Sequence, residues 1–168
     1  MQKILAKMDR VLAITLMLLM AAIVVDVSWQ VLSRFIVGDP SSVTEEIARF
    51  LLVWIGLLGA AYAFRMHSHL GLDIITAKLQ PEKKYRAEIF SQLMSFGFAG
   101  WVMVYGGISL VKLQLMLGQT SAALEIKMGY VYTVIPIAGV LICIYAIDNM
   151  ITARERISNA SDELKSID

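Results

Sequence analysis

The chain has 168 residues, of which 58% are hydrophobic and 17% are charged, and its mean hydropathy is +0.67. In a soluble domain about a quarter of all residues are charged, so this composition indicates an integral membrane protein. The formal net charge of +1 does not indicate a class of partner, but the basic residues are scattered rather than clustered on one face, which does not fit a nucleic-acid-binding protein. The single cysteine excludes an intrachain disulfide.

Four segments have the length and apolar character of a membrane-spanning helix, which needs about 20 mostly apolar residues. The sequence predicts spans at about residues 11–36, 44–64, 89–117 and 129–151. The first apolar run exceeds the h-region of a signal peptide, so we expect it to be a span rather than a cleaved leader. The connection at 37–43 contains Gly38, Asp39 and Pro40, and it is long enough only for a tight reversal. The predicted fold is therefore an all-α membrane protein whose first two helices form an antiparallel hairpin.

The connection at 65–88 is the longest, and between about residues 70 and 80 it mixes apolar and polar residues. This pattern predicts a short amphipathic helix that lies at the membrane interface between the second and third spans. We expect lipid headgroups to be contacted by the basic residues of this region, Lys78, Lys83, Lys84 and Arg86. The polar tail at 154–168 is expected to lie outside the membrane.

The Lys and Arg residues are distributed unequally between the two sides of the predicted bundle. Four lie on the side of the first and third connections, namely Arg34, Arg49, Lys112 and Lys127. Eleven lie on the other side, namely Lys3, Lys7, Arg10, Arg65, Lys78, Lys83, Lys84, Arg86, Arg154, Arg156 and Lys165. Because cytoplasmic loops carry the excess of basic residues, this asymmetry predicts that both the N and C termini are cytoplasmic.

Asp26 is an acidic residue inside the first predicted span, where it shares one helix face with Gln30 and Arg34. At 1.5 Å per residue it lies about 15 Å from the outer end of the span, and a lone carboxylate at that depth costs about 2.5–3.5 kcal/mol. Two interpretations follow. Asp26 forms an intramembrane ion pair with Arg49 or Lys112, or it is the proton or cation site of an exporter. We favour the ion pair because both cations are expected near its depth.

The second span carries a seam of small residues, Gly56, Gly59, Ala60 and Ala63. Small residues four apart let helices approach closely in lipid, where packing drives association. Packing within this chain and docking to another subunit use the same device, so the seam alone does not distinguish the two.

No arrangement of residues that would form a catalytic, cofactor or metal site stands out in the sequence. His67 and His69 lie in or beside the long connection rather than on facing helices, so they do not suggest a haem site. We also find neither an internal repeat nor the paired broken helices that build a transporter's midplane site. We therefore expect a non-enzymatic chain that is an accessory part of a larger assembly.

An acidic pair and an arginine open the second span, followed by a tryptophan, a Gly-Ala-Ala run, a second arginine, a histidine and an aspartate. These residues are Glu45, Glu46, Arg49, Trp54, Gly59, Ala60, Ala61, Arg65, His69 and Asp73. The pattern resembles the signature of the small membrane subunit of tripartite ATP-independent periplasmic (TRAP) transporters. The length and the predicted four-helix layout are also similar to those of that family.

The resemblance implies a scaffold subunit of a sodium-coupled transporter for an organic acid, of the sialic acid or dicarboxylate class, in the bacterial inner membrane. Its implied partners are a large membrane subunit, which would hold substrate and sodium, and a soluble periplasmic substrate-binding protein. No cofactor is expected on this chain. The residues expected at the interface with either partner are Glu45, Glu46, Arg49, Trp54, Gly56, Gly59, Ala60 and Ala63. The alternative is a self-contained four-helix proton-coupled exporter that uses Asp26.

Overall fold

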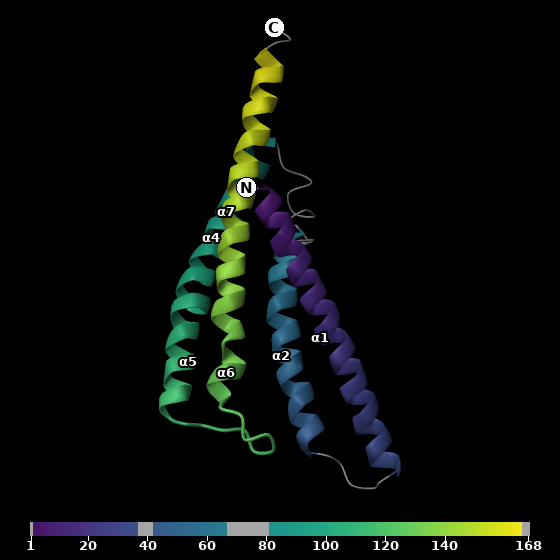
Figure 1. Ribbon diagram of the computed structural model, residues 1–168. Helices are drawn as coiled ribbons and strands as arrows, with labels where there is room; N and C mark the ends of the chain where they lie inside the picture. The colour runs from purple at the N-terminus through teal and green to yellow at the C-terminus, as the bar shows by residue number, and fades with distance from the viewer. Residues whose placement is uncertain (1, 37–41, 67–80, 166–168) are drawn as a thin grey trace.

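The computed structural model describes residues 2–36, 42–66 and 81–165, and these are helical apart from one loop and two short turns. The elements are α1 (Gln2–Ile36), α2 (Ser42–Arg65), α4 (Pro81–Phe98), the π-helix η1 (Ala99–Gly106), α5 (Gly107–Met116), α6 (Met128–Tyr132) and α7 (Val134–Lys165) (Figure 1). The predicted all-α fold is confirmed.

Within the described residues, four helical stretches are long and apolar enough to cross a membrane, which agrees with the four predicted spans. They run over Leu5–Ile36, Ser42–Arg65, Ile89–Met116 and Met128–Thr152. The third combines α4, η1 and α5 end to end, and the fourth combines α6 and most of α7. The predicted interfacial helix at 70–80, with Lys78, lies outside the described residues, as do the side chains of Lys83, Lys84 and Arg86.

The spans are arranged so that α1 begins and α7 ends at the same end of the bundle (Figure 1). The last turn of α1, the first turn of α2 and the loop that follows α5 lie at the opposite end. α1 packs on α2, α2 packs on α7, and α7 also packs on the third span, so α7 lies between the two halves of the molecule. The antiparallel hairpin of the first two spans is thus present, and the assignment of the two ends to compartments stays a prediction.

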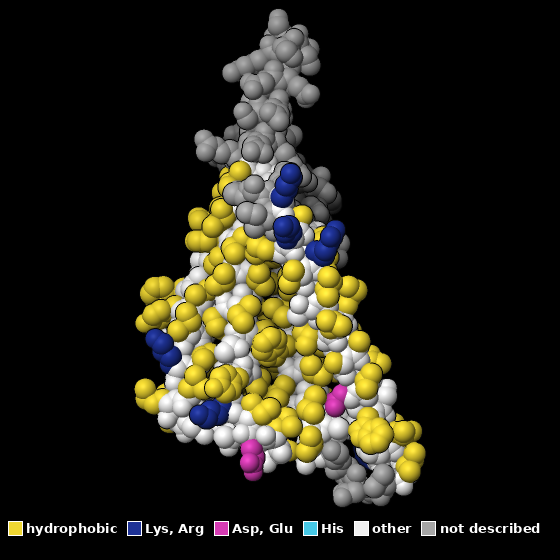
Figure 2. Space-filling model, viewed as in Figure 1, with side chains coloured by type: hydrophobic (Ala, Val, Ile, Leu, Met, Phe, Trp, Pro, Cys, Tyr) yellow, Lys and Arg dark blue, Asp and Glu magenta, His cyan; other side chains and the backbone are white. Residues whose placement is uncertain are grey.

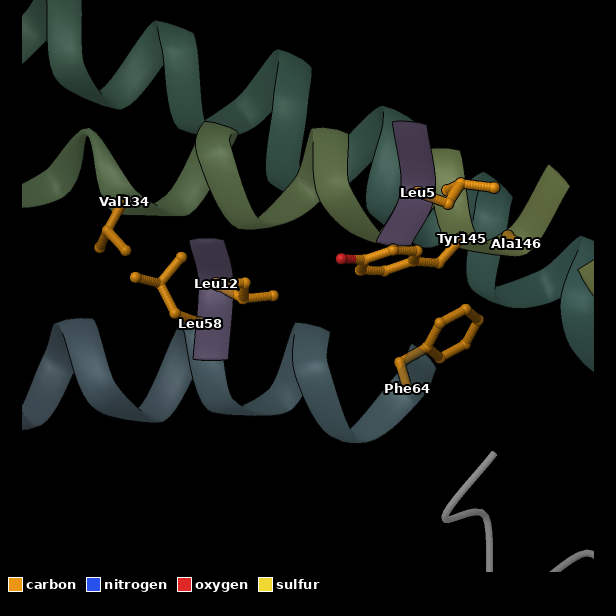
Figure 3. Close-up of a cluster of buried hydrophobic side chains, with 7 residues drawn as sticks. All are labelled: Leu5, Leu12, Leu58, Phe64, Val134, Tyr145 and Ala146. Carbon is orange, nitrogen blue, oxygen red and sulfur yellow. The ribbon is translucent and has the colours of Figure 1, made fainter. Parts of the chain in front are cut away.

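The buried core is concentrated where α1, α2 and α7 meet (Figure 3). Its members are Leu5, Leu12, Leu58, Phe64, Val134, Tyr145 and Ala146. Burial is uneven among the spans: in the most apolar window of the first span 6% of the residues are buried, compared with 33% in the fourth. α1 is therefore a peripheral helix whose apolar surface is largely uncovered by the rest of the chain.

The third and fourth spans approach each other closely through glycines. A Cβ added to Gly139 would lie 2.7 Å from the Cβ of Met103, and one added to Gly129 would lie 2.6 Å from the Cγ of Leu115. Real Cβ atoms do not approach so near, so only glycine permits this crossing. The fourth span is interrupted at Thr133, three residues before Pro136, whose ring nitrogen has no hydrogen to donate to a preceding carbonyl.

Candidate functional site

One face of α2 is exposed along its whole length. We call it the outward stripe of α2, and its members are Glu45, Arg49, Leu52, Gly56, Ala60 and Ala63. They recur at spacings of three and four residues, which places them on one side of a helix. The opposite side carries the buried residues Leu58, Ala61 and Phe64. α2 thus uses one face to hold the bundle together and leaves the other free.

Three residues of the small-residue seam, Gly56, Ala60 and Ala63, lie on the outward stripe, and the fourth, the partly exposed Gly59, lies beside it. A Cβ added to Gly56 or to Gly59 would meet no atom within 4 Å. At Gly129 and Gly139, in contrast, the space beside the glycine is occupied by side chains of the third span. The sequence left open whether the seam packs internally or against another protein, and in this chain the internal role is taken by glycines of the third and fourth spans.

The outward stripe is charged at the N-terminal end of α2. Arg49 Nη2 lies 2.9 Å from Glu45 Oε1, and the two side chains are 69% and 63% exposed. They are one helical turn apart, the spacing at which such pairs form readily on a helix surface. Glu45 and Arg49, both predicted interface residues, therefore lie on the same face as the seam.

The predicted ion pair of Asp26 with Arg49 or Lys112 is not formed. Arg49 is bound to Glu45, a partner only one turn away on its own helix. Asp26 Oδ2 is buried without a hydrogen bond, and within residues 2–36, 42–66 and 81–165 Asp26 makes no ion pair. Lys112 lies exposed on α5. Similar depth in the membrane brought the three residues together in the prediction, but depth does not fix the direction in which each helix turns its side chains.

Glu46 differs from its neighbour Glu45, because it turns toward the connection between α5 and α6. Its Oε1 accepts a hydrogen bond from the N–H of Ala122 at 3.1 Å. Its Oε2 accepts from the N–H groups of Ala123 and Leu124 at 3.0 and 2.9 Å. A carboxylate held by backbone N–H groups is a strong, charge-assisted contact. Glu46, predicted as an interface residue, thus anchors the 118–127 loop of its own chain to α2.

Trp54, also predicted at an interface, lies inside the bundle and is partly buried. Its indole Nε1–H donates a hydrogen bond to the backbone carbonyl of Val131 at 3.1 Å. Val131 is in α6, just before the interruption at Thr133. Trp54 therefore joins α2 to the fourth span, and its indole hydrogen bond is made inside the chain.

A charge cluster that the sequence analysis did not identify joins three helices at the other end of the bundle. Arg65 Nε lies 3.1 Å from Asp9 Oδ2, and Arg65 Nη1 lies 2.8 Å from Asp148 Oδ2. The three side chains are only 22%, 20% and 14% exposed, and the guanidinium carbon lies 5.6 Å from the ring centre of the fully buried Tyr145. The predicted four-pass topology already implied this proximity, because it puts the end of α2 beside the start of α1 and the later part of α7.

Comparisons with known proteins identify the family. The family model for tripartite ATP-independent periplasmic transporters, DctQ component, matches residues 23–156. The chain is 30% identical over 149 residues to the isethionate TRAP transporter permease protein DctMQ of Oleidesulfovibrio alaskensis, covering 85% of this chain but only 23% of that much longer protein.

Two further relatives are small permease proteins by name. The chain is 27% identical over 142 residues to a Haemophilus influenzae protein named as a TRAP transporter small permease protein, covering 84% of both chains. It is 34% identical over 82 residues to the sialic acid TRAP transporter small permease protein SiaQ of Vibrio cholerae, covering 49% of this chain and 45% of that one. The chain therefore belongs to the DctQ component family of TRAP transporters, multi-pass membrane proteins that are permease subunits and not enzymes.

Proposed function

We propose that this chain is the small scaffold subunit of a TRAP transporter in the bacterial inner membrane, where it braces a large transport subunit. The observation that carries the proposal is the outward stripe of α2, which is exposed and unpacked around Gly56 and Gly59. Membership of the DctQ component family supports the same assignment. The match to the isethionate permease protein also supports it, because the matched region is only 23% of that longer protein.

The small residues of the stripe favour a protein partner over lipid. A glycine offers lipid chains almost no side-chain surface, but it allows the backbone of a facing helix to come close, and that contact drives association in a bilayer. Gly56, Ala60 and Ala63 repeat this feature along one face. At the outer end the Glu45–Arg49 pair offers polar groups to the same partner. The proposed partner is a helix of the large subunit laid along α2.

The remaining parts of the proposal concern the transport cycle. The large subunit binds the substrate and sodium, and this chain holds no cofactor. The substrate is a small organic anion, for which sialic acid and dicarboxylates are the first compounds to test. Isethionate, a sulfonate named for one relative, is the next. The periplasmic substrate-binding protein docks at the end of the bundle where Glu45, Arg49 and the loop bound by Glu46 lie. Both termini lie at the other end, which is cytoplasmic.

Co-purification tests the interface. A tagged chain carrying Gly56→Leu or Gly59→Leu is expected to retain about tenfold less large subunit, which corresponds to about 1.4 kcal/mol. Gly97→Leu is the matched control, because a Cβ at Gly97 also meets nothing within 4 Å but this residue lies on α4. Since all three sites are open within the chain, none of the variants should unfold it. Equal retention of the large subunit by all three would contradict the proposed interface.

Reconstitution tests the scaffold role. Vesicles that contain this chain alone should show no uptake of the organic anion, and uptake should need the large subunit and the binding protein as well. Uptake by this chain alone would overturn the scaffold role, and it would revive the alternative of a self-contained exporter that uses Asp26.

A further inference from the structure

An open apolar groove of about 440 Å³ runs between α1, α2 and α7. Its walls include Lys7, Val11 and Thr15 of α1, Leu58 of α2 and Leu141 of α7. The volume falls within the range of sites that bind small molecules. From the level of Lys7 to that of Thr15 the groove descends about 12 Å at 1.5 Å per residue, from the charged end of the bundle into the apolar part.

Below Lys7 the groove offers no free polar group on α1. The hydroxyl of Thr15, the other polar side chain in its α1 wall, donates its hydrogen bond to the carbonyl of Val11 at 2.9 Å. Trp54, which lines the deep part, has its indole N–H bound to Val131. Water in such a groove would lack the two to four polar partners that hold it in a protein. The lining therefore suits a hydrocarbon chain.

One cation, Lys7, lines the mouth of the groove, and two more lie nearby on α1. Lys3, Lys7 and Arg10 are exposed and recur at spacings of four and three residues, so they share one face of α1. Figure 2 shows a group of cationic side chains near the beginning of α1, directly above the apolar surface. The adjacent acid, Asp9, is directed to Arg65 at 3.1 Å, and in the described part of the chain none of the three cations forms an ion pair.

We propose that this groove binds one anionic phospholipid, with an acyl chain along Val11, Thr15 and Leu58 and the phosphate at Lys7. Charge complementarity and position favour this occupant, because the Lys7 ammonium lies at one end of an apolar groove that runs toward the middle of the bundle. Basic residues near a membrane surface attract anionic lipids by electrostatics, and apolar surface adds to that binding. The proposal does not depend on the transport role described above.

Native mass spectrometry of the full chain tests the proposal, with phosphatidylglycerol and phosphatidylcholine of identical acyl chains added to the detergent. The wild-type chain is expected to retain one phosphatidylglycerol in preference to phosphatidylcholine. Lys7→Gln should reduce phosphatidylglycerol retention about fivefold, the effect of one basic residue near a membrane surface. Lys112→Gln, which removes an exposed cation on α5, is the matched control and should leave retention unchanged.

A second variant tests the acyl-chain part without altering charge. Thr15→Phe would fill the groove, and it should reduce retention of both lipids while the chain's melting temperature stays within a few degrees of the wild type. Equal phosphatidylglycerol retention by Lys7→Gln and Lys112→Gln would refute the headgroup site. If the assembled transporter loses this lipid and a photo-crosslinker at Thr15 captures the large subunit, the groove is a protein interface and the proposal fails.

Discussion

Replacing Arg65 by glutamine should destabilise the chain more than replacing Arg49, another arginine of α2, by glutamine. The substitution leaves the carboxylates of Asp9 and Asp148 facing each other without the guanidinium that lies 3.1 and 2.8 Å from them. Removing one partner of a buried ion pair costs about 3–5 kcal/mol, because an uncompensated charge stays behind. Since these side chains retain 14–22% exposure, we expect the lower end of that range, about 3 kcal/mol.

The measurement is thermal unfolding of the purified chain in detergent, and Arg49→Gln is the control. Both variants remove a guanidinium from α2, but the Arg49–Glu45 pair is 69% and 63% exposed. Exposed pairs one turn apart contribute about 0.3–0.5 kcal/mol. A loss of about 3 kcal/mol corresponds to roughly 6–12 °C in melting temperature for a chain of this size. Arg49→Gln should shift it by a degree or two.

A double variant tests the physical reason for the loss. If uncompensated carboxylates cause it, Asp148→Asn in the Arg65→Gln background should recover part of the stability, because it removes one of the two facing charges. Equal losses of stability in Arg65→Gln and Arg49→Gln would show that the Arg65 ion pairs contribute no more than an exposed pair. This result would contradict the prediction. The prediction is also refuted if Asp148→Asn adds a further loss in the Arg65→Gln background, since the cluster would then contribute packing rather than charge compensation.

Two further substitutions test the internal structure. Glu46→Ala should accelerate hydrogen exchange of the amides at 122–124, which lose their acceptor, whereas Glu45→Ala should leave their exchange unchanged; similar exchange in both variants would contradict the anchor. Gly139→Ala should lower the free energy of unfolding by about 1–3 kcal/mol through overpacking against the third span. Gly97→Ala, in open space, should be neutral or slightly stabilising because alanine is the better helix former. Equal effects of the two substitutions would show that the third and fourth spans do not pack tightly at Gly139.

The helices could be predicted from the sequence because membrane spans are specified by length and apolar composition alone. The connection at 37–43 was too short for anything but a hairpin, and that hairpin is present. The rotation of each helix about its axis was not predictable in the same way. Glu45 and Glu46 are adjacent in sequence, yet one lies on the outward stripe and the other holds the 118–127 loop.

Helix rotation also explains why the predicted Asp26 ion pair is not formed and why the cluster of Asp9, Arg65 and Asp148 was not predicted. Asp26 and Arg49 were matched by depth, but Arg49 points along the exposed stripe and finds Glu45. Asp9, Arg65 and Asp148 lie on three different helices, and their meeting depends on how those helices turn toward one another. A sequence gives the level of a residue in the membrane directly, whereas its direction depends on packing.

The small residues show the same limit. Glycines occur in the second, third and fourth spans, and the sequence does not say which of them the chain uses for its own packing. In the structure Gly139 and Gly129 lie at the close crossing of the third and fourth spans, whereas a Cβ added to Gly56 or Gly59 would meet no atom within 4 Å. The proposed interface at the seam therefore depends on how α2 is rotated in the bundle, which the sequence does not specify.

Photo-crosslinking in native membranes would show whether the outward stripe of α2 contacts the large subunit. A photoreactive residue at Ala60 is compared with one at Trp101, an exposed position on the third span whose side chain is 74% accessible. We expect the residue at Ala60 to yield an adduct with the large subunit and the residue at Trp101 to yield lipid adducts only. A large-subunit adduct at Trp101 with none at Ala60 would contradict it.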